Sequence, residues 1–150
     1  MTCDRQGTAT VLQHFAADES RVMKSVLIVE DEIFIAMEIE RILQDAGYTV
    51  VAIAADQSEA LAAAAAADVA FVDLNLRDGP TGPGLAHELA QTFGVRIVYV
   101  TANPSQIERP APTAVGYIRK PFSEEAIVMA AAIAARPETP AVAHQDVISL

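Results

Sequence analysis

The stretch DVAFVDLNL, residues 68–76, decides the fold, because a short run of strand-forming apolar residues ends there in an acid, Asp73. An earlier apolar run, VLIV at residues 26–29, ends in the acidic pair Glu30 and Asp31. Parallel strands end at the same edge of a sheet, so carboxylates far apart in sequence can meet there. The two stretches together predict a buried parallel sheet with an acidic cluster at its carboxyl edge.

Two later apolar runs also end in polar residues. Residues 97–100 lead into Thr101, and residues 116–118 lead into Arg119 and Lys120. An acid pair, an acid, a hydroxyl and a lysine therefore close four strands. One candidate site is predicted where these strand ends meet.

The composition suits a single domain. The chain has 150 residues, 52% of them hydrophobic, which is enough to bury one core. Its net charge of −10, without a cluster of Lys or Arg, argues against nucleic acid as a direct partner. The one cysteine excludes an internal disulfide, and apolar stretches are interrupted well short of membrane-spanning length. We expect a cytoplasmic protein with no membrane contact.

Three segments are expected along the chain. Residues 1–24 show no sustained period and are predicted to be a weakly ordered extension, with Met23 as a candidate natural start. Residues 25–136 alternate between strand-forming runs and helical periodicity, and form the domain. Residues 137–150 bear prolines, lack a period, and are predicted to be a tail.

Within residues 25–136 the pattern is that of repeated strand–helix units. The expected strands are 26–29, 48–53, 68–72, 96–100 and 114–118; the expected helices are 33–46, 57–67, one after a turn-rich loop at 78–84, one of one or two turns at 105–109, and one capped by Ser123. Three prolines, Pro104, Pro110 and Pro112, keep the helix near residue 105 short. These elements predict a doubly wound α/β sheet with helices on both faces.

The residue types at the strand ends suit phosphoryl chemistry. Neighbouring carboxylates repel by roughly 4 kcal/mol per pair at about 4 Å and an effective dielectric near 20, so the cluster needs a counter-ion. Magnesium prefers oxygen ligands and often binds one or two carboxylates plus a phosphate oxygen. Asp73 could then act as a nucleophile toward phosphorus, with Lys120 and Thr101 contacting the phosphoryl oxygens. His14, His87 and His144 show no ligand spacing and receive no metal or catalytic role.

Taken in order, these motifs resemble the receiver domain of response regulators, the CheY-like family of two-component signalling. The matching stretches are VLIVEDE (26–32), DVAFVDLNL (68–76), VT (100–101) and GYIRKPF (116–122), so the resemblance covers about residues 25–135. It implies a flavodoxin-like, five-stranded parallel sheet in the order 2-1-3-4-5. It also implies a phosphoprotein that acts in a phosphorelay and is not an enzyme.

The resemblance implies a role for each site residue. Glu30, Asp31, Asp73 and the backbone carbonyl of Asn75 match the magnesium ligands, and Asp73 matches the phosphoacceptor. Thr101 and Lys120 match the residues that contact the phosphoryl group, Tyr117 matches the aromatic switch, and Pro121 matches the proline of a cis peptide bond. A histidine kinase or histidine phosphotransfer protein would be the donor, and an unknown downstream protein the target.

One interval departs from the family pattern. Thr101 and Lys120 are closer in sequence than usual, which leaves the fourth helix short or absent and puts the coupling of Thr101 to Tyr117 in doubt. Two alternatives therefore stay open: a receiver fold that binds partners without phosphorylation, and a phosphohydrolase with an aspartate nucleophile. The second is disfavoured because Asn75 stands where such enzymes carry a second aspartate.

The polar residues Asn75 and Asn103 flank the expected site, and we hypothesise that they orient water there. A homodimer is left open.

Overall fold

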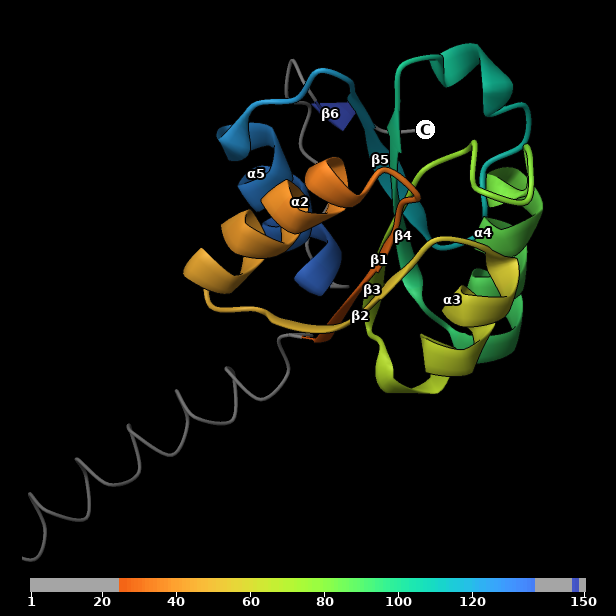
Figure 1. The fold of residues 1–150 in the computed structure, drawn as a ribbon, viewed down its shortest axis with the longest axis horizontal. Coiled ribbons are helices and arrows are strands. Elements are labelled where there is room, and N and C mark those ends of the chain that lie inside the picture. The colour runs from red at the N-terminus through yellow and green to blue at the C-terminus, as the bar shows by residue number, and fades with distance from the viewer. Residues whose placement is uncertain (1–24, 137–146, 149–150) are drawn as a thin grey trace, which may run out of the picture.

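The computed structural model describes residues 25–136 and 147–148 (Figure 1). The elements in chain order are β1 (Ser25–Val29), α2 (Ile33–Asp45), β2 (Thr49–Ala54), α3 (Gln57–Ala63), η1 (Ala64–Ala66), β3 (Val69–Val72), α4 (Gly82–Phe93), β4 (Arg96–Thr101), η2 (Pro104–Gln106), β5 (Ala114–Arg119), α5 (Glu124–Ala135) and β6 (Val147–Ile148). The expectation for residues 1–24 lies outside the described residues.

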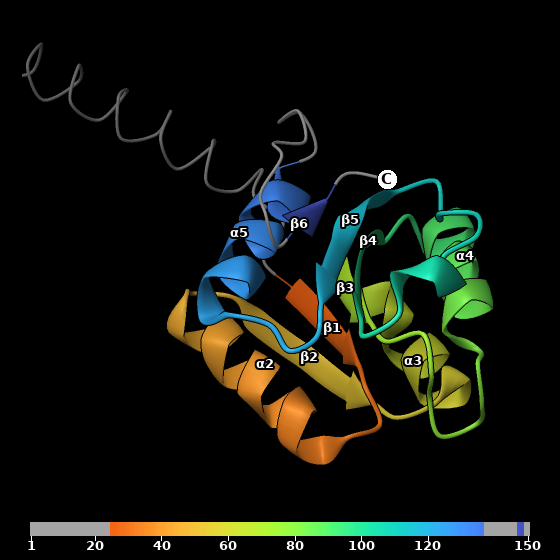
Figure 2. The ribbon, with the colours of Figure 1, turned by 90° about the horizontal axis from the view of Figure 1, so that it is seen from above.

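The strands form one sheet in the order β2-β1-β3-β4-β5-β6. The first five are parallel to one another, which confirms the predicted 2-1-3-4-5 arrangement. The structure adds one strand to the prediction, because β6 lies in the segment that was predicted to be a tail and pairs antiparallel with β5. Strand order reverses beside β1 and β3, and in folds of this kind the ligand site lies at the carboxyl ends of the strands near that point (Figure 2).

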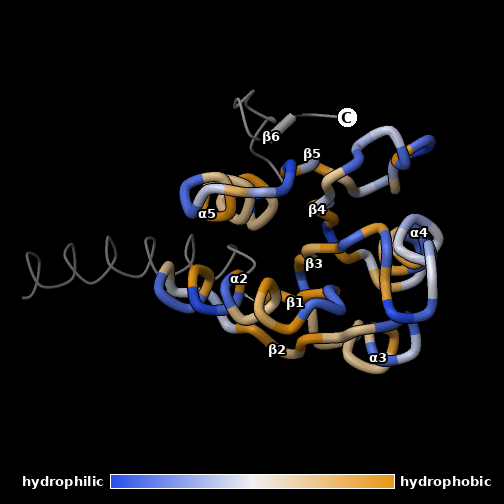
Figure 3. The backbone as a smooth tube through the Cα atoms, turned by 45° about the horizontal axis from the view of Figure 1, so that its top comes forward, coloured by the Kyte–Doolittle hydropathy of each residue, from blue (hydrophilic) through white to orange (hydrophobic). Residues whose placement is uncertain are grey.

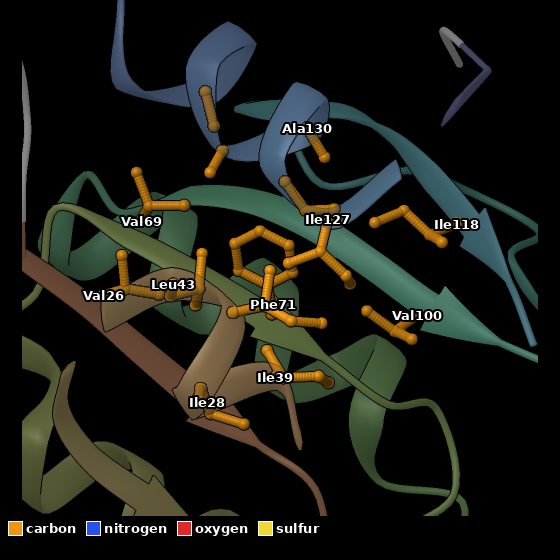
Figure 4. Packing of buried hydrophobic residues seen from close by; sticks show 14 of the residues in the cluster. Val26, Ile28, Ile39, Leu43, Val69, Phe71, Val100, Ile118, Ile127 and Ala130 are labelled. Atoms are coloured by element: carbon orange, nitrogen blue, oxygen red, sulfur yellow. The ribbon is translucent and has the colours of Figure 1, made fainter. Parts of the chain in front are cut away.

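Helices cover both faces of the sheet. Figure 1 shows α2 and α5 on one side of the strands and α3 and α4 on the other. Successive strand residues point to opposite faces, so each strand feeds two cores. Phe71 lies at the centre of the first core, between α2 and α5 (Figure 4). The fully buried Tyr99 belongs to the second core, beneath α3 and α4.

The colouring by hydropathy follows this layering, with apolar strands at the centre and polar residues on the outer turns (Figure 3).

Local interactions set the ends of two of the helices. Ser123 accepts a hydrogen bond from the backbone of Ala126 and caps α5 as predicted. Gly47, with φ of 98°, follows α2 in a left-handed conformation that glycine adopts without steric cost. Among the described residues, none of the helices has the length and apolar character needed to cross a bilayer.

The helix predicted over residues 57–67 ends early. It is α-helical only to Ala63 and tightens into the 3₁₀ turn η1. The backbone of Asp68 donates to the Ser25 carbonyl at 2.8 Å, and its carboxylate accepts from the Ser25 amide at 3.2 Å. These bonds bind the chain to the edge of β1, so the polyalanine run must leave the helix before Asp68.

Two other boundaries differ from the sequence prediction. The loop expected at 78–84 ends sooner, because α4 begins at Gly82; its early proline, Pro83, is compatible with the first helical turn. The short helix expected at 105–109 is a single 3₁₀ turn, η2, at Pro104–Gln106. A proline disfavours the helical conformation in the residue before it, so Pro110 prevents a helix from continuing through Arg109.

Side-chain hydrogen bonds replace the missing helix in the β4–β5 connection. The Tyr99 hydroxyl accepts from the Ala111 amide at 2.9 Å. His87 on α4 lies with Nε2 2.7 Å from the carbonyl oxygen of Arg109, to which that nitrogen donates. The Thr113 hydroxyl donates to the Val95 carbonyl at 2.5 Å. The connection is therefore tied to β4 and α4 by individual bonds.

Candidate functional site

The polar residues that close the strands meet at the carboxyl edge of the sheet. Lys120 follows β5, Thr101 ends β4, and the acidic residues follow β1 and β3. Of these residues, Asp31, Asp73 and Lys120 line a pocket of about 370 Å³. Its lining consists of Asp31, Glu32, Asp73, Asn75, Leu76, Ala102, Asn103 and Lys120.

Sheet hydrogen bonds hold the backbone of this edge. The Asp73 amide donates to the Val29 carbonyl at 2.9 Å, so β3 continues its pairing with β1 up to the site. The Glu30 amide donates to Ala54, and the Lys120 amide donates to Thr101, each also at 2.9 Å. Each strand thus delivers its terminal side chain to the pocket from a backbone that its neighbour fixes.

Three carboxylates gather in the pocket. One oxygen from each of Glu30, Asp31 and Asp73 lies within 4.8 Å of the other two. Glu30 is only 2% exposed and Asp73 7% exposed, whereas Asp31 is exposed to solvent. The predicted convergence of Glu30, Asp31 and Asp73 is therefore present in the structure.

Lys120 is the cation of this cluster. Its Nζ donates to Oε1 of Glu30 at 2.8 Å and to Oδ2 of Asp73 at 3.1 Å. Burial raises the pKa of Glu30 to about 7, against the lowering effect of the Lys120 hydrogen bond. Burial alone would lower the pKa of Lys120, but the two carboxylates outweigh it and leave that pKa above its ordinary value. The lysine therefore stays charged between two nearly buried acids.

The cluster suits a hard divalent cation. Three carboxylates face one lysine, so ionisation of all three leaves the pocket with an excess of negative charge. The donors are all oxygens, and one of the carboxylates opens to solvent, as magnesium with its bound waters requires. The donor set therefore fits the metal that the sequence predicted.

Thr101 and Tyr117, two further predicted site residues, are not among the residues that line the pocket. Thr101 is 1% exposed, and its hydroxyl oxygen accepts from the Asn103 amide at 2.9 Å. Tyr117 lies on β5 opposite Tyr99 of β4, is half-buried, and packs against the core beneath α3 and α4. The Lys120–Pro121 peptide bond is cis.

Asn75 joins the site to the β4–β5 connection. Its amide N–H donates to Oδ1 of Asp73 at 3.2 Å, and its side chain forms two hydrogen bonds with Gln106 of η2. Gln106 was not predicted from the sequence to belong to the site. The local sequence, residues 103–106, indicates only a turn, because a proline and short polar residues are typical of turns. No local pattern pairs Gln106 with a residue 31 positions away.

Comparison with known proteins identifies the family that has this fold and this acidic pocket. The family model of the response regulator receiver domain matches residues 26–132, and the chain belongs to that family. The CheY-like resemblance in the sequence is therefore confirmed. Receiver domains typically bind Mg²⁺ in an acidic pocket.

Among curated proteins, the chain is similar to the phyllosphere-induced regulator PhyR of Methylorubrum extorquens, with 34% identity over 103 residues. That match covers 65% of this chain and 38% of PhyR. This chain is also 32% identical over 111 residues to the sensory transduction protein RegX3 of Mycobacterium tuberculosis. That match covers 71% of this chain and 48% of RegX3. The chain thus spans less than half the length of either relative.

Solved structures show the same relationship. The solution structure of the PhyR receiver domain of Erythrobacter litoralis has a TM-score of 0.70 and 27% identity, covering 83% of this chain and 99% of that domain. The crystal structure of the response regulator PhyR from Brucella abortus has a TM-score of 0.64 and 30% identity, covering 87% of this chain and 55% of that protein. Similarity to PhyR is therefore seen in both sequence and structure.

Proposed function

We propose that Asp73 accepts a phosphoryl group from a phosphohistidine of a histidine kinase or histidine phosphotransfer protein. The observation that carries this proposal is the position of the Asp73 carboxylate. It lies in an open pocket, 3.1 Å from the ammonium of Lys120 and beside two further carboxylates. A nucleophile, a fixed positive charge and a metal-binding donor set therefore share one site.

In the proposed step an Asp73 carboxylate oxygen attacks the phosphorus of the phosphohistidine. A P–O bond forms as the P–N bond breaks, the imidazole nitrogen takes up one proton, and Asp73 becomes an acyl phosphate. Charge develops on the phosphoryl oxygens during transfer, so a cation placed before the reaction lowers the barrier. Lys120 supplies that charge, and its contact with Glu30 holds it in place.

Magnesium is the proposed cofactor. Glu30, Asp31, Asp73 and the backbone carbonyl of Asn75 would hold it. When bound, it would neutralise the carboxylates and polarise the phosphoryl oxygens. The hydrogen bond from the Asn75 backbone N–H to the Asp73 carboxylate supports this assignment, because it fixes the backbone next to the nucleophile.

We further propose that the phosphorylated state is read through Thr101 and Tyr117 and passed to another protein. Thr101 is the buried hydroxyl at the end of β4, and Tyr117 stands on the neighbouring strand. A protein target is in keeping with the similarity to PhyR, because the PhyR of Bartonella quintana, another similar solved structure, is an anti-anti-sigma factor. In this proposal the protein transmits a signal and does not turn over a substrate.

The test is incubation with acetyl phosphate or phosphoramidate and magnesium, followed by intact-protein mass spectrometry. We expect one added phosphoryl group, which Asp73→Asn abolishes because an amide is a poor nucleophile of nearly the same shape. Asp78→Asn is the matched control, since Asp78 is an exposed aspartate outside the pocket lining. No adduct on the unmodified chain, or an adduct that persists in Asp73→Asn, would refute the proposal.

A further inference from the structure

A reciprocal pair of amide side chains joins Asn75, which lines the pocket, to Gln106 of η2. Nδ2 of Asn75 donates to Oε1 of Gln106 at 3.0 Å, and Nε2 of Gln106 donates to Oδ1 of Asn75 at 3.1 Å. Asn75 follows the nucleophile by two residues, whereas Gln106 belongs to η2, the turn in place of a fourth helix. We call this contact the amide pair.

The amide pair engages the Asn75 side-chain amide, which could otherwise hydrogen-bond a water molecule. Asn75 lines the pocket, and its backbone N–H donates to the Asp73 carboxylate, so the residue lies next to the proposed nucleophile. Both polar atoms of that side chain are directed to Gln106. An amide whose donor and acceptor bond a neighbour is less free to hold a water molecule against a phosphoryl group.

Backbone and side-chain bonds keep η2 where Gln106 can reach Asn75. The Gln106 amide donates to the Asn103 carbonyl at 3.1 Å, and the Asn103 amide donates to the Thr101 hydroxyl at 2.9 Å. The Ser105 hydroxyl donates to Oδ1 of Asn103 at 2.5 Å, so the second asparagine of the pocket is also engaged. The connection is therefore built to present Gln106 to the site.

We propose that Gln106 is a positioning residue that holds the Asn75 amide away from hydrolytic water and so lengthens the life of the phosphoryl group on Asp73. The inference rests on the proposed function. In hydrolysis, a water oxygen attacks phosphorus and the bond between phosphorus and the Asp73 oxygen breaks. The products are the Asp73 carboxylate, hydrogen phosphate and one proton. Release of Asn75 from Gln106 lets its amide orient the attacking water.

The experiment measures decay of the phosphorylated chain by mass spectrometry after the small-molecule donor is removed, with magnesium present. Gln106→Ala frees the Asn75 amide and is expected to shorten the half-life about fivefold, the effect of one ordinary hydrogen bond on a rate. Asn75→Ala removes both the pair and the water-orienting group, so no such shortening is expected. The double variant should match Asn75→Ala.

The comparison of these variants separates positioning from simple shielding of the pocket. If the pair only kept η2 closed over the site, Asn75→Ala and Gln106→Ala would shorten the half-life equally, and that result would overturn the proposal. Gln106→Glu keeps an acceptor for Nδ2 of Asn75 but loses the donor to its Oδ1. An intermediate half-life is expected for it, and one as short as that of Gln106→Ala would also contradict the proposal.

A second measurement does not depend on decay. The side-chain NH₂ protons of Asn75, followed by NMR in the unphosphorylated chain, should exchange faster with water in Gln106→Ala. They should be unchanged in Gln91→Ala, a control on the exposed surface of α4 that is not part of the pocket lining. Unchanged exchange in Gln106→Ala would overturn the amide pair itself. Thermal melting of each variant checks that the fold is intact.

Failure of the inference differs from failure of the proposed function. If no adduct forms on Asp73, both are refuted. If an adduct forms and decays at the same rate with and without Gln106, only the inference is refuted.

Discussion

The two sides of the pocket are built from different interactions. The acidic side, Glu30, Asp31 and Asp73 with Lys120, is charged, and two of its carboxylates are nearly buried. The polar side, Asn75, Thr101, Asn103 and Gln106, is neutral and joined by hydrogen bonds that lie largely at the surface. The acidic side is thus held by ion pairs, and the polar side by neutral hydrogen bonds.

The difference follows from the energetics of each interaction. Removal of one partner from a buried ion pair leaves an uncompensated charge, which is strongly destabilising. A neutral hydrogen bond exchanges with water and contributes about 1 kcal/mol net. The acidic side therefore has one stable arrangement, whereas the polar side can rearrange at small cost.

The largest expected effect comes from removing the cation of the acidic side. Lys120→Ala should slow phosphorylation by acetyl phosphate about 100-fold, the usual cost of losing one fixed group that stabilises developing charge. The measurement is the initial rate of adduct formation by mass spectrometry at fixed magnesium.

Arg119→Ala is the matched control for that change, because Arg119 precedes Lys120 and is exposed at the end of β5. It should phosphorylate at the rate of the unmodified chain. Equal rates for Lys120→Ala and Arg119→Ala would show that the charged side has no part in transfer.

The next largest effect tests the backbone that both sides share. A Cβ built on Gly82 would lie 2.2 Å from the Asp73 carbonyl oxygen and 2.5 Å from the Leu74 Cα. Gly82→Ala should therefore displace the strand end that carries the nucleophile and lower the free energy of unfolding by about 3 kcal/mol. Urea denaturation followed by circular dichroism measures this change.

Gly84→Ala provides the comparison on the same helix, since a Cβ there meets no atom within 4 Å. Alanine is the better helix former, so this variant should be up to about 1 kcal/mol more stable. A Gly82→Ala protein as stable as Gly84→Ala would contradict the close contact between α4 and the site.

A smaller effect is expected from loosening the β4–β5 connection, which carries Gln106 of the polar side. Tyr99→Phe removes the acceptor of the buried Ala111 amide and should lower the free energy of unfolding by about 1 to 2 kcal/mol. Phosphorylation of Asp73 should proceed at an unchanged rate, because no charged group of the acidic side is altered. A rate reduced as strongly as in Lys120→Ala would erase the distinction between the two sides.

The smallest expected effect is that of Ser105→Ala. Its hydroxyl bonds only the side chain of Asn103 at an exposed position, so the stability should change by less than about 0.5 kcal/mol. Thermal melting checks this, and a large loss would mean that η2 depends on that bond.

The acidic side was predictable from sequence, and so were Asn75, Thr101 and Asn103 of the polar side, whereas Gln106 was not. The apolar runs of β1, β3, β4 and β5 lead into functional residues, and parallel strands bring such residues to one edge without any knowledge of loops. Gln106 reaches the site only because η2 takes a particular path. That path depends on Tyr99, His87 and Thr113, whose partners lie well away along the chain.

Element boundaries failed where long-range contacts overrode local preference. Alanine favours a continuous helix up to Ala67, yet pairing of Asp68 with Ser25 ends it at Ala63. The two residues of β6 are too few to form a periodic pattern, so that strand had no signal apart from the edge it pairs with. Type and order of the main elements were predicted because burial on a parallel sheet leaves long apolar runs.

That short strand has a consequence for how the molecule meets other chains. Open sheet edges present unpaired backbone groups and invite intermolecular strand pairing. β6 pairs with β5 at Tyr117 and Ile118. At the opposite end of the sheet, β2 pairs with β1 alone among the described strands. Among the described strands, β2 therefore offers the longer unpaired edge for strand addition by another chain, whereas β5 is already paired at Tyr117 and Ile118.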